Sequence, residues 1–402
     1  MFRFQDVLDI NKLETRVQYL DHTRENSSNV KKRRAIHSEL VEFLSKLPRQ
    51  PTLVNCTSHD LKCFLVHKDA HGKTKVHNND CVNLAKQNSG SCNCPKRLAA
   101  KSVQNVVSHL IVIFDMDIEK GARSTNPAMT RDIKDYIKSV QEEQAKAHVS
   151  VRQAKPVFVN KLKLISSYIA NRLERGDISV KDRYVLARDQ CWLKVQFFGG
   201  DRAGDLGHVK MQEVLQLPDG EGYVINRSYG KTLRGRDGSS NCFALKKCPD
   251  KTICPVAALQ LFISSMKKYG VFKTTGYLFR PVIEHGTVLD EKLSYEAMAD
   301  RFRFYLRELC IDEGETLHGI RAGCAISLLM SGAAKDPSAV MDHVGWFSRD
   351  SVAHYTRSNT MWDLGNTATS FARQMASTSV GSIEDDFVMY GDVTSFATAF
   401  TS

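Results

Sequence analysis

The sequence lacks long hydrophobic runs. Its longest apolar run, LIVIF at 110–114, is far shorter than the roughly 20 residues needed to span a bilayer. The opening residues, MFRFQDVLDINKLE, also lack the apolar core of a secretory signal peptide. We therefore expect no membrane partner for this chain.

Basic residues are nearly missing from the C-terminal stretch 358–402. This stretch has one basic residue, Arg373, against five acids: Asp363, Glu384, Asp385, Asp386 and Asp392. The whole chain carries a net charge of +11, and without the tail it has 55 basic against 40 acidic residues. This excess suits a polyanion such as DNA, although a merely soluble basic surface explains it equally well.

The sequence also has no internal repeat, and its 402 residues are enough for two or three domains. Helical apolar spacing dominates, and the segments EGYVINRSY and NCFALKK alternate as an antiparallel hairpin does. The predicted fold class is mainly α with a small antiparallel β-sheet. We expect a loose segment (1–30), a helical domain (31–150), a linker (151–158), a second domain (159–357) and a tail (358–402). The tail either docks on a neighbouring copy or forms a flexible end.

An irregular loop at 72–95 interrupts the first domain and contains clustered cysteines. The eleven cysteines and the lack of an export signal indicate reduced thiols. His77, Cys81, Cys92 and Cys94 can form a tetrahedral His/Cys₃ zinc site, which would fold an insertion too small for its own core. Unrelated thiols are an alternative, because other candidate ligands are close in sequence: His59, Cys63, His67 and His71.

The stretch VGWFSRDSVAHYTR at 344–357 contains a single tyrosine, Tyr355. A tyrosine hydroxyl needs activating partners to attack a substrate at neutral pH. The nearest candidates are His318 and Arg321, which are three residues apart and share one face of a predicted helix, and Trp346 after Gly345. Taken singly, a surface aromatic and a solvated helix end explain these residues as well.

The order His-x-x-Arg, Gly-Trp and Tyr resembles the C-terminal signature of the tyrosine recombinases, the phage-type integrases. The segment GDRAGDL resembles the upstream Gly-x-Arg-x-x-Asp-Leu motif of that family and supplies Arg202 and Asp205. The family also has a hairpin lysine, and YGKTLRGRDG places Lys231 there. Three other basic residues compete for the lysine's role: Arg234, Arg236 and Lys246.

The resemblance implies a role for each residue. Tyr355 would attack a DNA phosphodiester and form a 3′-phosphotyrosyl link, while Arg202 and Arg321 grip the non-bridging oxygens. His318 would move the tyrosine proton or bond a phosphate oxygen. Three further roles follow: Lys231 protonates the leaving 5′-oxygen, Trp346 donates its indole N–H to the phosphate, and Asp205 holds Arg202 or the local turn in place. His343 and His354 are expected to be structural or surface residues.

The loop sequence GKTKVH, followed by a cysteine and CNCP, resembles the zinc ribbon of the plant ALOG DNA-binding domain. That domain is similar to the N-terminal part of recombinases from DIRS-type retrotransposons. The resemblance implies a helical core-binding domain with a zinc-ribbon insertion, followed by a tyrosine-recombinase catalytic domain, and one structural zinc. The run VKKRR at 30–34 is either a nuclear-import signal or part of a DNA-contacting set: Lys31, Lys32, Arg33, Arg34, Lys96, Arg97 and Lys101.

The sequence therefore predicts a DNA strand-exchange enzyme of a mobile element, acting on double-stranded DNA. The family resemblance implies a homotetramer on two DNA sites and chemistry that needs no cofactor. We expect a nuclear location in a eukaryote, or an intracellular location with DNA elsewhere. A DNA-binding transcriptional regulator that kept the fold without the chemistry is the main alternative, and a topoisomerase-like relaxing enzyme is a third.

Overall fold

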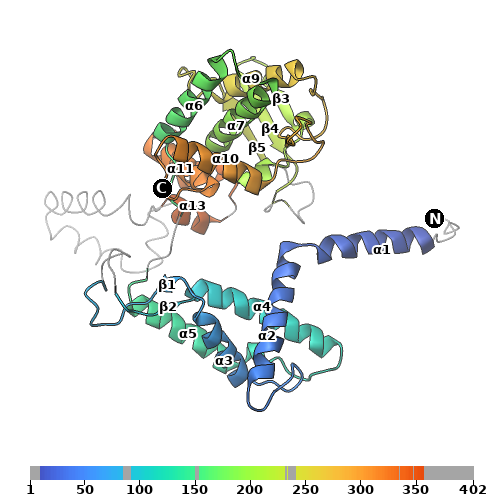
Figure 1. The fold of residues 1–402 in the computed structure, drawn as a ribbon, viewed down its shortest axis with the longest axis vertical. Coiled ribbons are helices and arrows are strands. Elements are labelled where there is room, and N and C mark those ends of the chain that lie inside the picture. Colours follow the sequence, from blue (N-terminus) through green and yellow to red (C-terminus); the bar gives the residue numbers. More distant parts are fainter. Residues whose placement is uncertain are drawn as a thin grey trace, which may run out of the picture. The chain divides into compact units, whose positions relative to one another are not determined.

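The computed structural model divides the chain into two compact units, Met1–Arg152 and Gln153–Ser402 (Figure 1). The structure describes residues 10–84, 92–149, 154–230, 233, 241–334, 336–346 and 348–356. Lys231, Arg234, Arg236 and the tail 358–402 therefore lie outside the described residues. Within the described parts of the chain, no helix is long and apolar enough to cross a membrane.

Unit 1 is a helical domain with a small two-stranded insertion. In chain order its elements are α1 (Ile10–Glu25), α2 (Ser28–Lys46), α3 (Ser58–Asp69), β1 (Thr74–Lys75), β2 (Lys96–Arg97), α4 (Ala100–Glu119), the 3₁₀ turn η1 (Pro127–Met129) and α5 (Arg131–Lys146). Helices α2 to α5 share one core, in which the side chains of Leu40, Phe64, Leu110 and Phe114 are fully buried.

Helix α1 differs from the sequence-based expectation. The segment 1–30 was expected to be loose, but Ile10–Glu25 is helical and has no buried residue. A polar composition hid the helix, because none of its side chains is needed for the core of unit 1.

Unit 2 surrounds one buried helix. It contains α6 (Val159–Glu174), α7 (Val180–Gly199), α8 (Ala203–Leu206), η2 (Met211–Glu213), β3 (Val214–Gln216), β4 (Gly222–Arg227), β5 (Asn241–Lys246), α9 (Pro255–Lys268), α10 (Tyr295–Glu308), α11 (Leu317–Met330), α12 (Pro337–Val344) and α13 (Arg349–Thr356). Most of α7 is buried around its circumference, which marks it as the central helix of the unit.

The predicted hairpin is present as the β4–β5 pair of a three-stranded antiparallel sheet ordered β3-β4-β5. Ile225 pairs with Phe243, and Arg227 pairs with Asn241. The mainly α fold with a small antiparallel sheet is therefore confirmed.

Two glycines of α11 allow the chain to cross this helix closely. A Cβ atom at Gly319 would lie 2.0 Å from the carbonyl oxygen of Lys155, and one at Gly323 would lie 1.9 Å from that of Val157. The backbone N–H of Val157 donates to the Gly319 carbonyl at 2.9 Å. Residues 155–157, expected to be linker, thus pack on the helix that carries His318 and Arg321.

Candidate functional site

Four residues predicted from the sequence meet at the junction of α11, α12 and α13. The Tyr355 hydroxyl lies 2.6 Å from Nε2 of His318. The Tyr355 ring stacks on Trp346, with centroids 4.8 Å apart and planes 22° apart. The Arg321 guanidinium carbon is 5.1 Å from the Trp346 ring centroid and 6.0 Å from that of Tyr355. A tyrosine, a histidine and an arginine are thereby held together at one point.

Local structure explains how the helices present these groups. Helix α12 ends at Gly345 in the left-handed conformation (φ 69°), and the chain then turns so that Trp346 is buried. Helix α7 ends in the same way at Gly200 (φ 59°), whose carbonyl accepts a 2.5 Å hydrogen bond from Nη1 of Arg321. Both turns favour glycine, because a side chain is strained at positive φ.

Several buried donors at this site have no hydrogen-bond partner within the described part of the chain. They are Arg202 Nη1, Arg321 Nε, Arg321 Nη2 and Trp346 Nε1. Buried polar groups are normally satisfied, and an unpaired one is costly. The arrangement is therefore suited to an anion with several acceptor oxygens.

Burial and neighbouring charge shift two pKa values here. Burial, followed by the positive charge of Arg202, lowers the pKa of Arg321 to about 10. His318 lies at the surface, but surrounding protein atoms desolvate its ring and lower its pKa, and Arg321 and Arg202 lower it further. His318 is thus neutral at pH 7 and able to accept a proton from Tyr355.

Asp205 contacts both Arg202 and an arginine of strand β4, Arg227. Its carboxylate is 3.6 Å from Arg202 Nη1 and 3.7 Å from Arg227 Nη1. Arg227 also pairs with Asp201, and the side chains of that pair are 99% buried. The carboxylates of Asp201 and Asp205 therefore tie strand β4 to the loop that presents Arg202.

Asp201 and Arg227 were missed by the sequence reasoning. Ile225 and Arg227 are both buried on β4, two positions apart, so Arg227 continues the inward face of the strand. An arginine at an inward strand position next to a glycine-rich turn is the signal that was available. Its partner, Asp201, directly precedes Arg202.

The competing residues are placed as follows. Lys246, one rival for the lysine's role, forms an exposed 2.5 Å pair with Asp219. Nε2 of His343 donates a 2.7 Å hydrogen bond to the Phe198 carbonyl, which is a structural contact. His354, expected to be a structural or surface residue, has its ring edge-on to the Tyr355 ring, with the centroids 5.3 Å apart.

The four predicted metal ligands form a second cluster, in unit 1. Ligand atoms of His77, Cys81, Cys92 and Cys94 all lie within 4.8 Å of one another, and this is the only such group among the described residues. His77 Nδ1 is 3.4 Å from Cys81 Sγ and 3.5 Å from Cys92 Sγ. A tetrahedral zinc with Zn–S of about 2.3 Å and Zn–N of about 2.0 Å places its nitrogen and sulfur ligands about 3.5 Å apart, and the two N–S distances fit this value.

A backbone hydrogen bond favours the thiolate form of one of the four residues, Cys92. The backbone N–H of Cys94 stabilises the Cys92 thiolate and lowers the pKa of Cys92 to about 6. Strands β1 and β2 close the base of the loop, with Thr74 opposite Arg97. The rival ligands His59, Cys63 and His67 lie on α3, outside the cluster.

The predicted DNA-contacting residues lie on three elements of unit 1. Lys31, Lys32, Arg33 and Arg34 are on α2, Lys96 and Arg97 form β2, and Lys101 is on α4. All of these except Arg33 and Arg97 are exposed. A hollow between α2 and α4 is lined by Arg33, Arg34, His37 and Lys120, among others.

Comparison with known proteins identifies the two parts. The ALOG domain family matches residues 17–142. In overall fold, the chain resembles the XerH site-specific recombinase bound to palindromic difH substrate (TM-score 0.52, 15% identity, 80% of this chain and 74% of that one). A variant of the Tn1549 transposon integrase, in complex with a circular intermediate DNA, is also similar (TM-score 0.50, 11% identity, 89% and 97%). Residues 17–142 thus match the ALOG domain, and the chain has the fold of these recombinases. The resemblances to the ALOG domain and to the tyrosine-recombinase fold, stated from the sequence, are confirmed.

Curated relatives of the ALOG domain are plant proteins. Protein G1-like9 of Oryza sativa subsp. indica is 35% identical over 98 residues, which are 24% of this chain and 34% of that protein. LIGHT-DEPENDENT SHORT HYPOCOTYLS 5 of Arabidopsis thaliana is 33% identical over 96 residues, or 24% and 52%. The chain spans only about a third to a half of the length of these two relatives.

Proposed function

We propose that this protein cuts and rejoins double-stranded DNA, with Tyr355 as the nucleophile. The observation that carries the proposal is the 2.6 Å contact between the Tyr355 hydroxyl and His318, beside buried guanidinium and indole donors. The similarity to DNA-bound recombinases supports it at the level of the fold.

In the proposed first step, the Tyr355 oxygen attacks the phosphorus as its proton passes to His318. The phosphorus–O5′ bond breaks, a 3′-phosphotyrosyl bond forms, and the leaving 5′-oxygen takes a proton from Lys231. Nη1 of Arg202, Nη2 of Arg321 and Nε1 of Trp346 donate to the non-bridging oxygens, where negative charge increases in the transition state. A 5′-hydroxyl of another strand then reverses the reaction.

We further propose that the ALOG domain contacts DNA and holds one structural zinc. Its exposed lysines and arginines on α2, β2 and α4 supply the sequence-independent phosphate contacts. Zinc bound by His77, Cys81, Cys92 and Cys94 would fix the loop between β1 and β2. Assembly as a tetramer on two DNA sites, an origin in a DIRS-type element, and a nuclear location in a eukaryotic host complete the proposal.

Trapping on nicked DNA tests the nucleophile. The protein is incubated with a library of duplexes that carry a nick just downstream of a randomised segment, so that cleavage releases a short fragment and cannot reverse. We expect a protein–DNA adduct that survives denaturing electrophoresis for the wild type. Tyr355→Phe is expected to remove it, while Tyr295→Phe, at the exposed start of α10, is a matched control that retains it.

The same experiment separates the alternatives. An adduct that persists in Tyr355→Phe would show that another residue is the nucleophile. The ALOG match favours a DNA-binding regulator as the second candidate function. Sequence-selective DNA binding with no adduct in the wild type would support that regulator and contradict strand exchange.

A further inference from the structure

Helix α1 presents large apolar side chains to solvent. Ile10, Leu13, Val17 and Leu20 are between 49% and 63% exposed, and no residue of this helix is buried. Single exposed apolar residues are common, but four on one side of one helix form a patch. Such a patch indicates a contact with another surface.

The four residues follow the spacing of a coiled coil. They are separated by three, four and three positions, which makes Ile10 and Val17 a positions and Leu13 and Leu20 d positions of a heptad. A helix that packs on the core of its own domain has a wider apolar face than this narrow seam.

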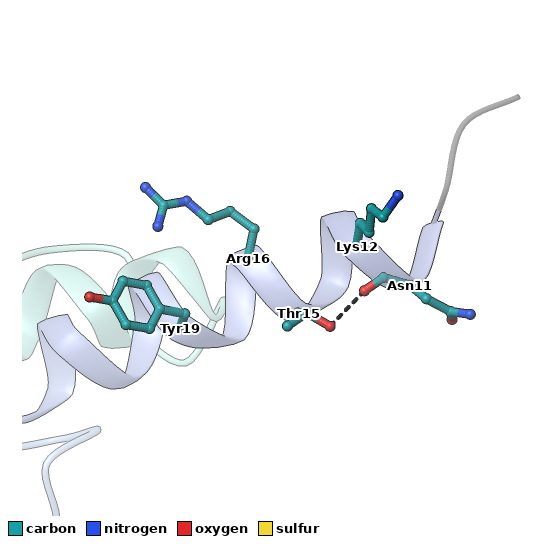
Figure 2. Close-up of a pocket in the computed structure, with 5 residues that line it drawn as sticks. All are labelled: Asn11, Lys12, Thr15, Arg16 and Tyr19. Carbon is teal, nitrogen blue, oxygen red and sulfur yellow. Dashed lines mark hydrogen bonds between the residues drawn. The ribbon is translucent and has the colours of Figure 1, made fainter. Parts of the chain in front are cut away.

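The other side of α1 is polar, as Figure 2 shows for Asn11, Lys12, Thr15, Arg16 and Tyr19. The Thr15 hydroxyl donates to the Asn11 carbonyl at 2.7 Å, and the Arg16 guanidinium carbon lies 5.4 Å from the Tyr19 ring centroid. A single helix provides every lining residue of the hollow on this side. It is therefore a shallow surface feature and not a ligand pocket.

The balanced charges of α1 argue against DNA and against an anionic membrane as its binding partner. Three basic residues (Lys12, Arg16, Arg24) balance three acidic residues (Glu14, Asp21, Glu25). DNA and anionic membrane surfaces attract helices with an excess of positive charge. A balanced helix with a narrow apolar seam instead matches another helix of the same kind.

We propose that α1 pairs in parallel with α1 of a second copy of this chain. In a parallel pair, a g residue faces the e residue five positions later on the partner helix. Arg16 is at g and Asp21 is at e, so the pair forms two opposite-charge contacts. An antiparallel pair would bring Glu14 and Asp21 next to the acidic e positions of the other copy.

The shortness of the apolar seam determines the concentration at which two copies pair. Two heptads give a weak interface in free solution, because short helices hold each other loosely. A Kd of about 100 µM would give partial dimerisation in free solution at concentrations up to about 200 µM, and nearly full pairing at the effective concentrations of about a millimolar that copies on one DNA molecule reach. The pairing depends on α1 alone, so it does not rest on the catalytic role proposed for Tyr355.

Sedimentation equilibrium of the full chain, from about 1 to 200 µM, tests the pairing. We expect reversible dimerisation of the wild type. Val17→Asp should weaken it by about 30-fold or more, because a charge would replace a buried apolar group at the centre of the seam. Thr15→Asp, on the polar side, is the matched control and should leave it unchanged. Thermal unfolding should be the same for both variants, because α1 has no buried residue.

Asp21→Arg decides the orientation. In the parallel pair it places two arginines opposite each other and should weaken dimerisation by about fivefold. Adding Arg16→Asp should then restore the wild-type value. Strengthening by Asp21→Arg alone would indicate the antiparallel pair. A wild type that stays monomeric at about 200 µM, or dimerisation that survives Val17→Asp, would overturn the proposal.

Discussion

Asp201 is a fully buried carboxylate in the loop that presents Arg202, and Arg227 is its main partner. An ion pair in this setting contributes little net stability, but the removal of one partner leaves a buried charge uncompensated. The pair therefore acts chiefly to fix the loop and strand β4 against each other.

Replacement of Arg227 by methionine should destabilise unit 2 by about 3–5 kcal/mol in chemical denaturation, because Asp201 loses its partner. Lys246→Met provides the control, since it breaks an exposed pair with Asp219. We expect the control to cost less than about 1 kcal/mol. Equal losses for the two variants would contradict the structural role of the buried pair.

His318 determines how DNA cleavage should depend on pH. Its pKa is below the ordinary value of 6.5, mainly because of burial. The neutral ring, which would accept the tyrosine proton in the proposed reaction, is therefore retained above that pKa and lost as the pH falls below it. Single-turnover cleavage should stay constant from pH 8 to about 6.5 and decline at lower pH. His318→Asn should be slower and lack this decline, and a wild-type decline beginning near pH 7.5 would contradict the assignment.

Residue identity and order were enough to predict four members of the site. His318, Arg321, Trp346 and Tyr355 lie within a 38-residue stretch whose short helices bring them together. Arg227 and Asp201 were not predicted, because their contact depends on how β4 packs against the turn after α7. The role of Lys231 stays a prediction, because that residue is outside the described part of the chain.

At the scale of elements, the insertion depends on one glycine. A Cβ atom at Gly72 would lie 1.9 Å from the backbone carbon of Arg97, so no side chain fits where the loop closes. This contact brings the two strands together and, with them, the two halves of the metal cluster. The motif Gly-Lys at 72–73 is thereby explained by packing.

Gly72→Ala should destabilise unit 1 by about 3 kcal/mol and weaken its metal binding, because the backbone of Arg97 must move. Gly176→Ala is the control, since a Cβ atom there meets nothing within 4 Å. Thermal unfolding and metal competition with a chelating dye would measure both effects. Wild-type behaviour of Gly72→Ala would show that the loop closes differently.

Elements with a clear period were predictable, and elements without one were not. Alternating residues revealed β4 and β5, whereas β3 is too short, at three residues, to show a pattern. Helix α1 does have a heptad period, but it was missed because that period covers only two heptads of an otherwise polar segment.

At the scale of the whole molecule, each unit has its own hydrophobic core. The two units should therefore unfold separately, giving two transitions in calorimetry. A strong zinc chelator should lower the transition temperature of unit 1 alone, because bound metal stabilises only the unit that holds it. A shift of both transitions would contradict independent units.

Elemental analysis gives a second measurement on the same samples. The wild type should contain one zinc per chain, and Cys94→Ser should contain none. Cys63→Ser, which changes a rival cysteine on α3, should keep the metal. Loss of zinc in Cys63→Ser would indicate that Cys63, on α3, is a zinc ligand.

Trp346 and Tyr355 belong to a small hydrophobic cluster, formed with Leu329, Val340 and Val344, that is distinct from the main core of unit 2. Helix α11 bridges the two, since Leu317 and Ile320 belong to the main core. Small cores open locally at lower free energy than large ones. An opening confined to this cluster withdraws the tyrosine from His318 while Arg202 stays in place. Under the proposed function, such an opening would separate phosphate binding by Arg202 from strand cleavage by Tyr355, because the two residues belong to different parts of the unit.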